Sequence, residues 1–163
     1  MRKLMVVLAL MVGLSGCGAA ETFETVSDEL VQPVMEQTGE IVLTVPDSAS
    51  TPDMEAEDGG KLYLCDGYTL TVQTLDGGDL NRTVKTLCGY ELDALTVLQT
   101  RDGGWNRHEW IWVSAGEGGE HLGRAAVLED GKYHYCITVM ADAADAPALE
   151  PEWDGLFASF AVT

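Results

Sequence analysis

The sequence predicts an α+β domain in which helices flank an antiparallel β-sheet. Most apolar runs between residues 61 and 141 are short and rich in β-branched or aromatic residues, which favours strands. Short turn sequences join several of them, such as Asp-Gly at 66–67 and 130–131, and such turns connect antiparallel neighbours. Two other segments have helical spacing, and each needs a face of the sheet to cover.

Eight segments have the residue types of strands. The Asp66-Gly67 pair separates two of them and predicts a two-residue hairpin. In chain order the predicted strands are residues 40–46, 61–65, 68–75, 94–101, 106–116, 121–129, 132–141 and 160–163. Residues 47–60 are rich in turn formers and predict a loop.

The two helices are predicted from their ends and their spacing. Asp79 is a favourable N-cap for a helix over residues 80–88, because its carboxylate can accept from free backbone N–H groups, and Gly89 is a natural end. The second helix is predicted from about 148 to 158. Its large apolar residues recur at helical spacing and are Trp153, Leu156, Phe157 and Phe160.

The start of the chain resembles a bacterial lipoprotein signal. Arg2 and Lys3 precede an apolar run over 4–14, which is too short to cross a bilayer as a helix. The run ends in Leu-Ser-Gly-Cys, similar to the lipoprotein cleavage motif, with Cys17 as the lipidated residue. The alternative is an ordinary secretion signal followed by an incidental cysteine.

This resemblance implies a division of the chain and a location. Residues 1–16 would be the signal peptide, 17–39 the lipid anchor and tether, and 40–163 a single α+β domain. The expected location is the cell membrane, where the lipid on Cys17 would hold the chain at the extracytoplasmic face.

The charge of the chain excludes some partners. The sequence has 27 Asp and Glu against 9 Lys and Arg, a formal net charge of −18. Removing residues 1–16 takes away two basic residues and none of the acidic ones, so the formal charge becomes −20. Such a chain is repelled by nucleic acid and by anionic lipid headgroups, so we expect no nucleic-acid partner.

The C-terminal stretch "KYHYCITVMADAADAPALEPEWDGLFASFAV" is similar to the C-terminal half of Mog1/PsbP-like domains. The stretches "YLCDGYTLTVQTLDGGDLNRTVKTLCGY" and "AGEGGEHLGRAAVLEDGKYHY" also resemble small lipoproteins of Gram-positive gut anaerobes. The resemblance, over roughly residues 60–163, implies an antiparallel sheet sandwiched by helices. PsbP-type proteins assist photosystem assembly and Mog1-type proteins bind a small GTPase. No position matches a functional motif of either, so no residue role is carried over.

The predicted strands place a candidate ligand or partner face on one side of the sheet. With Gly118-Gly119 as a two-residue turn, Trp112 lies opposite Ala125; with Asp130-Gly131 as another, His134 lies opposite Val127. Trp110, Trp112 and His134 then share one face, which is either a binding surface or covered by another segment. The other face is predicted to be the helix-covered core. Its members are Ile111, Val113, Leu122, Ala126, Leu128, Tyr133, Tyr135, Ile137 and Val139.

The histidines do not predict a metal site. In this register His108 and His121 are separated by eight residues of strand, or roughly 26 Å, and zinc ligands all lie near 2 Å from one ion. His134 would lie about 11–12 Å from His108. We therefore expect no metal and no cofactor. The catalytic motifs of serine hydrolases, phosphate loops, dinucleotide folds and zinc proteases are also absent from the sequence, so we expect no catalytic residue.

Three cysteines follow Cys17. Cys65 and Cys88 are candidates for a disulfide, which the chain-entropy model values at roughly 3 kcal/mol, and the alternative is two buried free thiols. Cys136 remains single. With His134 two residues earlier on the same face, it could form a nucleophile–base pair.

These observations favour a membrane-anchored extracytoplasmic lipoprotein that acts as a non-enzymatic binding or accessory module. Its partner would be an envelope protein or a small ligand. The alternative is an extracytoplasmic enzyme or small-ligand-binding protein that uses the face of Trp110, Trp112 and His134.

Overall fold

The computed structural model describes residues 38–51, 60–116 and 118–163. They fall within a single compact unit that spans residues 37–163, and they form an antiparallel sheet with two α-helices. The predicted α+β class is therefore confirmed. The elements are β1 (Ile41–Val42), β2 (Lys61–Cys65), β3 (Tyr68–Asp76), α1 (Leu80–Cys88), the short 3₁₀ helix η3 (Leu92–Ala94), β4 (Leu98–Asp102), β5 (Trp105–Gly116), β6 (Gly119–Glu129), β7 (Tyr133–Asp142), α2 (Ala146–Ser159) and β8 (Ala161–Val162).

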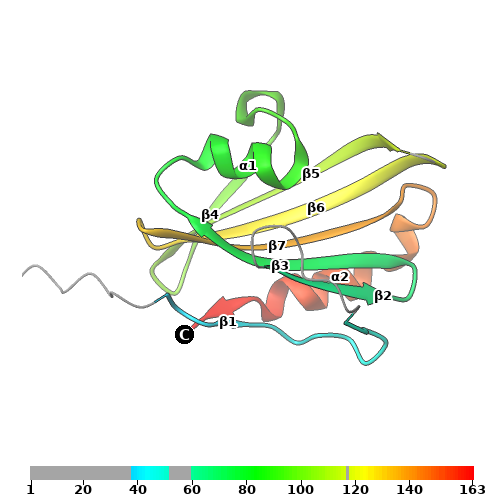
Figure 1. The fold of residues 1–163 in the computed structure, drawn as a ribbon, viewed down its shortest axis with the longest axis horizontal. Helices are drawn as coiled ribbons and strands as arrows, with labels where there is room; N and C mark the ends of the chain where they lie inside the picture. Colours follow the sequence, from blue (N-terminus) through cyan, green and yellow to red (C-terminus); the bar gives the residue numbers. More distant parts are fainter. Residues whose placement is uncertain (1–37, 52–59, 117) are drawn as a thin grey trace, which may run out of the picture. The chain divides into compact units, whose positions relative to one another are not determined.

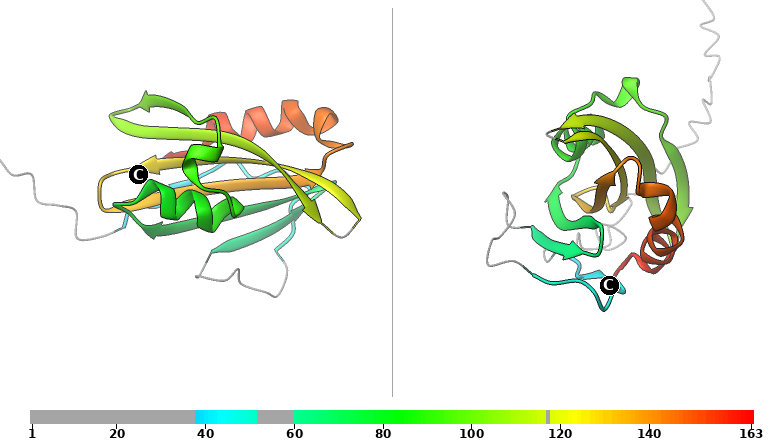
Figure 2. Two further views of the ribbon diagram at one scale, coloured as in Figure 1. Left: turned by 90° about the horizontal axis from the view of Figure 1, so that it is seen from above. Right: turned by 90° about the vertical axis from the view of Figure 1, so that its right-hand side faces the viewer.

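The main sheet has six strands in the order β2-β3-β7-β6-β5-β4, and β1 pairs separately with β8. Every neighbouring pair is antiparallel. The two α-helices lie on opposite faces of the main sheet, as Figure 1 and the turned views of Figure 2 show. No helix within the described ranges is long and apolar enough to cross a membrane.

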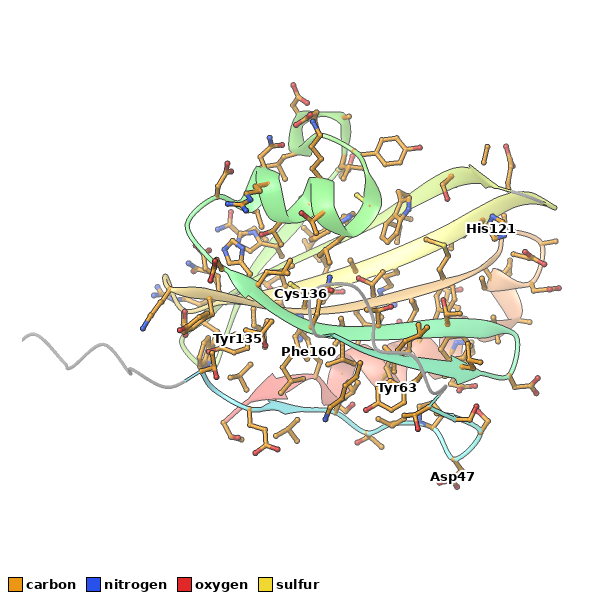
Figure 3. The ribbon with its side chains drawn as sticks, in the orientation of Figure 1. Asp47, Tyr63, His121, Tyr135, Cys136 and Phe160 are labelled. Atoms are coloured by element: carbon orange, nitrogen blue, oxygen red, sulfur yellow. The ribbon has the colours of Figure 1, made fainter. Side chains whose placement is uncertain are left out.

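Each face of the sheet has its own apolar core. The core on the α2 side contains Tyr135, Ile137, Phe157 and Phe160, and Ile41 of β1 and Val162 of β8 pack against it. The core on the α1 side contains Val84 of α1 together with Trp110, Trp112 and Cys136. Figure 3 shows Cys136 on the α1 side and Phe160 on the α2 side.

Both ends of α1 are as predicted. The carboxylate of Asp79 accepts from the backbone N–H groups of Asn81 at 3.0 Å and Arg82 at 3.4 Å. Gly89 ends the helix with a φ of 79°, a conformation that glycine adopts without strain.

Two predicted strands are shorter than expected because their apolar residues serve another purpose. The strand predicted at 40–46 pairs only over Ile41 and Val42. The strand predicted at 94–101 begins at Leu98, since the preceding η3 and the residues after it turn toward the α1-side core. Leu95 and Val97 pack against that core instead of continuing β4.

The register was predicted correctly for one hairpin and wrongly for two. Cys65 pairs with Tyr68 as expected. In the β5–β6 hairpin the closing pair is Gly116 and Gly119, so Trp112 lies opposite Gly123 and not Ala125.

In the β6–β7 hairpin Glu129 lies opposite His134, whereas the sequence placed Val127 there. The Asp130 carboxylate accepts from the backbone N–H groups of Lys132 at 2.8 Å and Tyr133 at 2.6 Å, which widens the turn. Both register errors are of two residues. Because side chains alternate with a period of two, each side chain remains on its predicted face.

Candidate functional site

The three residues of the predicted ligand face lie on the α1 side but are covered. Trp110 is 3% exposed, Trp112 4% and His134 0%. Val84 of α1 packs with Trp110 and Trp112, and Leu92 and Leu95 from the segment after α1 pack against the same cluster. Thr83 of α1 contacts His134. The face is therefore part of the protein interior. Its three side chains have too little exposed surface to bind a ligand or substrate directly.

The Trp112 indole packs closely on the neighbouring strand β6 at Gly123. A methyl group at Gly123 would lie 2.3 Å from Cζ2 and 2.4 Å from Cε2 of the Trp112 indole. Only glycine allows this approach, since carbon atoms in contact normally lie about 3.5–4.0 Å apart. Gly123 thus positions Trp112 under α1.

His134 is the centre of a buried polar cluster that the sequence only partly predicted. Its Nδ1 lies 2.7 Å from the Thr83 hydroxyl of α1. The Glu129 carboxylate lies between two imidazoles, 3.8 Å from Nε2 of His134 and 3.3 Å from Nε2 of His108. Burial lowers the pKa of His134, although Glu129 opposes that shift. The wider β6–β7 turn puts Glu129 opposite His134, and the carboxylate then lies beside both imidazoles.

The surroundings of Cys136 disfavour its role as a nucleophile beside His134. Burial alone raises the pKa of the Cys136 thiol far above its ordinary value, so the reactive thiolate is disfavoured. The thiol donates to the backbone carbonyl oxygen of His134 at 3.4 Å. Within the described ranges, no group of three His, Cys, Asp or Glu side chains is arranged to hold a metal ion. His121 lies far from this cluster, at the opposite end of the paired strands β6 and β7 (Figure 3). Its Nε2 is 3.2 Å from the Asp142 carboxylate.

The disulfide suggested between Cys65 and Cys88 is wrong for this structure. Cys65, Cys88 and Cys136 are all free. Cys65 packs against the α2-side core, whereas Cys88 packs against the α1-side core and donates to the carbonyl oxygen of Val84. The sheet separates them, because the face of α1 that carries Cys88 packs on the side opposite to Cys65. The predicted lipidation site, Cys17, lies outside the described residues.

An exposed apolar surface occurs instead on the α2 side of the sheet. Ile111 and Val113 were predicted to be core, yet they are 60% and 44% exposed, and Leu98 of β4 is 62% exposed. Leu98 lies opposite Glu109, so all three side chains share the α2 face of neighbouring strands β4 and β5. We call Leu98, Ile111 and Val113 the apolar strip.

A charged network separates this strip from the buried part of α2. The Arg124 guanidinium lies 2.7 Å from Asp154, 3.1 Å from Glu109 and 4.3 Å from the centre of the Phe157 ring. Arg107 lies 2.6 Å from Glu109 and donates to the carbonyl oxygen of Phe157 at 2.7 Å. The Asp154 and Glu109 carboxylates together raise the pKa of Arg124, although its burial opposes the shift.

A groove of about 430 Å³ lies between α2 and strands β5 and β6, within the usual range for ligand sites. We call it the α2 groove. Ile111, Leu122 and Trp153 supply apolar walls, and Arg124, Glu150 and Asp154 supply charges. Ile111 also belongs to the apolar strip, so the groove and the strip are continuous. The available sequence signal was the presence of Arg107 and Glu109 on the same strand face as Ile111 and Val113, since charged residues on a helix-covered face indicate incomplete cover.

The fold is the Mog1/PsbP-like α+β sandwich. Three solved structures with this arrangement resemble the chain. The PsbP of the cyanobacterium Synechocystis sp. PCC 6803, called CyanoP, has a TM-score of 0.56 at 14% identity, covering 81% of this chain and 96% of CyanoP. The Ran-binding protein Mog1p of Saccharomyces cerevisiae has a TM-score of 0.53 at 13% identity, covering 75% of this chain and 89% of Mog1p.

The third is LpqN of Mycobacterium tuberculosis, which is involved in cell envelope biogenesis. It has a TM-score of 0.53 at 15% identity, covering 78% of this chain and 86% of LpqN. No protein-family model matches the chain, and no curated protein matches its sequence. At these identities the likeness establishes the fold, and the function has to be argued from the site.

Proposed function

We propose that the protein is a lipid-anchored extracytoplasmic module that binds an envelope partner and performs no chemistry of its own. The observation that carries the binding role is the continuity of the apolar strip with the α2 groove. Exposed apolar side chains that gather beside a groove are typical of interaction sites. His134 and Cys136, whose side chains could take part in catalysis, are instead fully buried on the α1 side of the sheet.

The location rests on the sequence. A basic start, an apolar run over 4–14 and a Leu-Ser-Gly-Cys ending support lipidation of Cys17. The structural similarity to LpqN, which is involved in cell envelope biogenesis, supports an accessory role outside the cytoplasm. With a formal charge of −20 after removal of residues 1–16, the lipid and not a basic surface would hold the chain to the membrane.

The anchor is tested by fractionating cells that express the wild type, Cys17→Ser or Cys65→Ser. We expect the wild type and Cys65→Ser in the membrane fraction, labelled by a fatty-acid analogue. Cys17→Ser should lose the label and leave that fraction. If Cys17→Ser stays membrane-bound, or if the wild type takes up no label, the anchoring proposal is wrong.

The binding role is tested by photo-crosslinking in intact cells. A photoreactive residue at Ile111 should give a discrete adduct, and one at Gln99 should give none. Gln99 is a matched control, because it is also exposed on neighbouring β4 but lies opposite His108 and so points to the other face. Val113→Asp should remove the Ile111 adduct. Equal adducts at both positions, or none at Ile111, would refute binding at this surface.

A further inference from the structure

The α2 groove offers an apolar floor that the described part of the chain leaves uncovered. Ile111 and Leu122 lie on neighbouring strands and face α2, and the helix contributes Trp153. Of the six large apolar residues that are exposed in the described ranges, three belong to the adjoining strip. A ligand along this surface would therefore bury apolar area both in the groove and beside it, at about 25 cal/mol per Å² removed from water.

The groove also contains a hydrogen-bond donor without an acceptor. Trp153 is 2% exposed, and its indole N–H has no hydrogen-bond partner in the described structure. A buried donor in this state is costly, and buried indole N–H groups usually find an acceptor. The indole nitrogen is closed off from solvent, so Trp153 offers a bound segment only the part of its ring that lines the groove.

The charges of the groove favour a positively charged ligand. Arg124 is already occupied by Asp154 and Glu109, so it offers little to an incoming anion. Glu150 makes no ion pair within the described ranges and is exposed at the groove. The walls thus contain one guanidinium against two carboxylates, in a chain of net charge −18. Such a surface attracts cations and steers them to the site.

The same charges argue against two other occupants. The chain's own tether contains acidic residues and no basic ones between residues 18 and 30. A second copy would carry the same net charge of −18 and be repelled over the whole surface. Neither has the positive charge that Glu150 and Asp154 favour.

We infer that the α2 groove binds a basic, apolar segment of a partner protein, with the apolar side chains against Ile111 and Leu122 and a Lys or Arg side chain beside Glu150. This inference rests on the proposed binding function and specifies its ligand.

The test is a titration of the full-length chain, in non-ionic detergent, with three short peptides. One alternates Lys and Leu, one alternates Glu and Leu, and one alternates Lys and Ser. We expect saturable binding of the Lys–Leu peptide alone, and weaker binding as the salt concentration rises. Equal binding of the Glu–Leu peptide, or no saturable binding of the Lys–Leu peptide, would overturn the inference.

Matched variants locate the site. Ile111→Ser and Glu150→Lys should each weaken the Lys–Leu peptide by about tenfold. Leu64→Ser, a similar loss of an exposed apolar residue, and Asp47→Lys, a similar charge reversal away from the groove (Figure 3), should leave binding unchanged. All four sites are at least partly exposed, so thermal melting should show each variant folded. Equal losses in the control variants would place binding elsewhere and overturn the inference.

The outcomes separate this inference from the proposed function. An Ile111 crosslink without Lys–Leu binding would retain the binding function and refute the ligand chemistry. Absence of the crosslink would refute the binding function itself.

Discussion

Replacing Gly123 with alanine tests whether Trp112 is locked against the sheet. The added methyl group would lie 2.3–2.6 Å from three indole atoms, so the ring or the strand must move by about 1 Å to restore a normal contact. Trp112 is buried under α1 and has little room to move. Overpacking of this kind costs about 1–3 kcal/mol, which exceeds the gain of up to about 1 kcal/mol from replacing a strand glycine.

The assay is urea unfolding followed by tryptophan fluorescence, with thermal melting beside it. A loss of 1–3 kcal/mol should lower the melting temperature by about 4–12 °C in a domain of this size. Gly155→Ala is the matched control. Gly155 lies in α2, and a methyl group there meets nothing within 4 Å, so this variant should gain up to about 1 kcal/mol from its higher helix propensity.

A double-mutant cycle provides the refutation. In a Trp112→Leu background the clash is gone, so Gly123→Ala should cost far less than in the wild type. If Gly123→Ala destabilises both backgrounds equally, contact with the indole ring is not the cause, and the close packing of Trp112 on Gly123 does not explain the loss.

Three further predictions concern His134, the cysteines and the cap of α1. Burial lowers the pKa of His134, so the native state takes up its proton less readily than the unfolded chain. This contribution to stability is fully present above the unfolded pKa of about 6.5 and is lost as the pH falls through the folded pKa. His134→Asn should remove that part of the pH dependence of the unfolding free energy measured in urea. An unchanged pH dependence in the variant would contradict this prediction. A thiol reagent should label Cys65 and Cys88 before Cys136 in the native chain, and non-reducing mass mapping should find all three free; a Cys65–Cys88 linkage would contradict the structure. Asp79→Ala should cost about 1 kcal/mol in unfolding free energy through loss of the α1 cap, whereas no loss would show that the cap contacts contribute nothing.

The sequence predicted which face each strand residue occupies because alternation depends only on parity. The registers of the hairpins that turn near Gly118 and Asp130 were each wrong by two residues, and every side chain still lies on its predicted face. Turn geometry depends on side-chain contacts such as those of Asp130 with its own loop. Composition does not reveal them.

The candidate site was less predictable, because helix placement is a tertiary property. The pattern of β5 identifies Ile111 and Trp112 as facing opposite sides, but it does not tell which side a helix covers at that point. In the structure α1 and the residues after it cover the tryptophans, while α2 leaves Ile111 exposed. Along this part of β5, the side predicted to be core is therefore exposed, and the side predicted to be a binding face is buried.

The pairing of β1 with β8 sets an order on folding. The backbone groups of Glu40 and Thr163 bond to each other at 3.1 and 3.0 Å, across 123 positions of sequence. Contacts of such long range form late, because the loop that they close has a large conformational entropy. The segment that joins the domain to the residues before it is thus secured only when the last strand has arrived. The six-stranded sheet can therefore assemble before the β1–β8 pairing fixes the start of the domain.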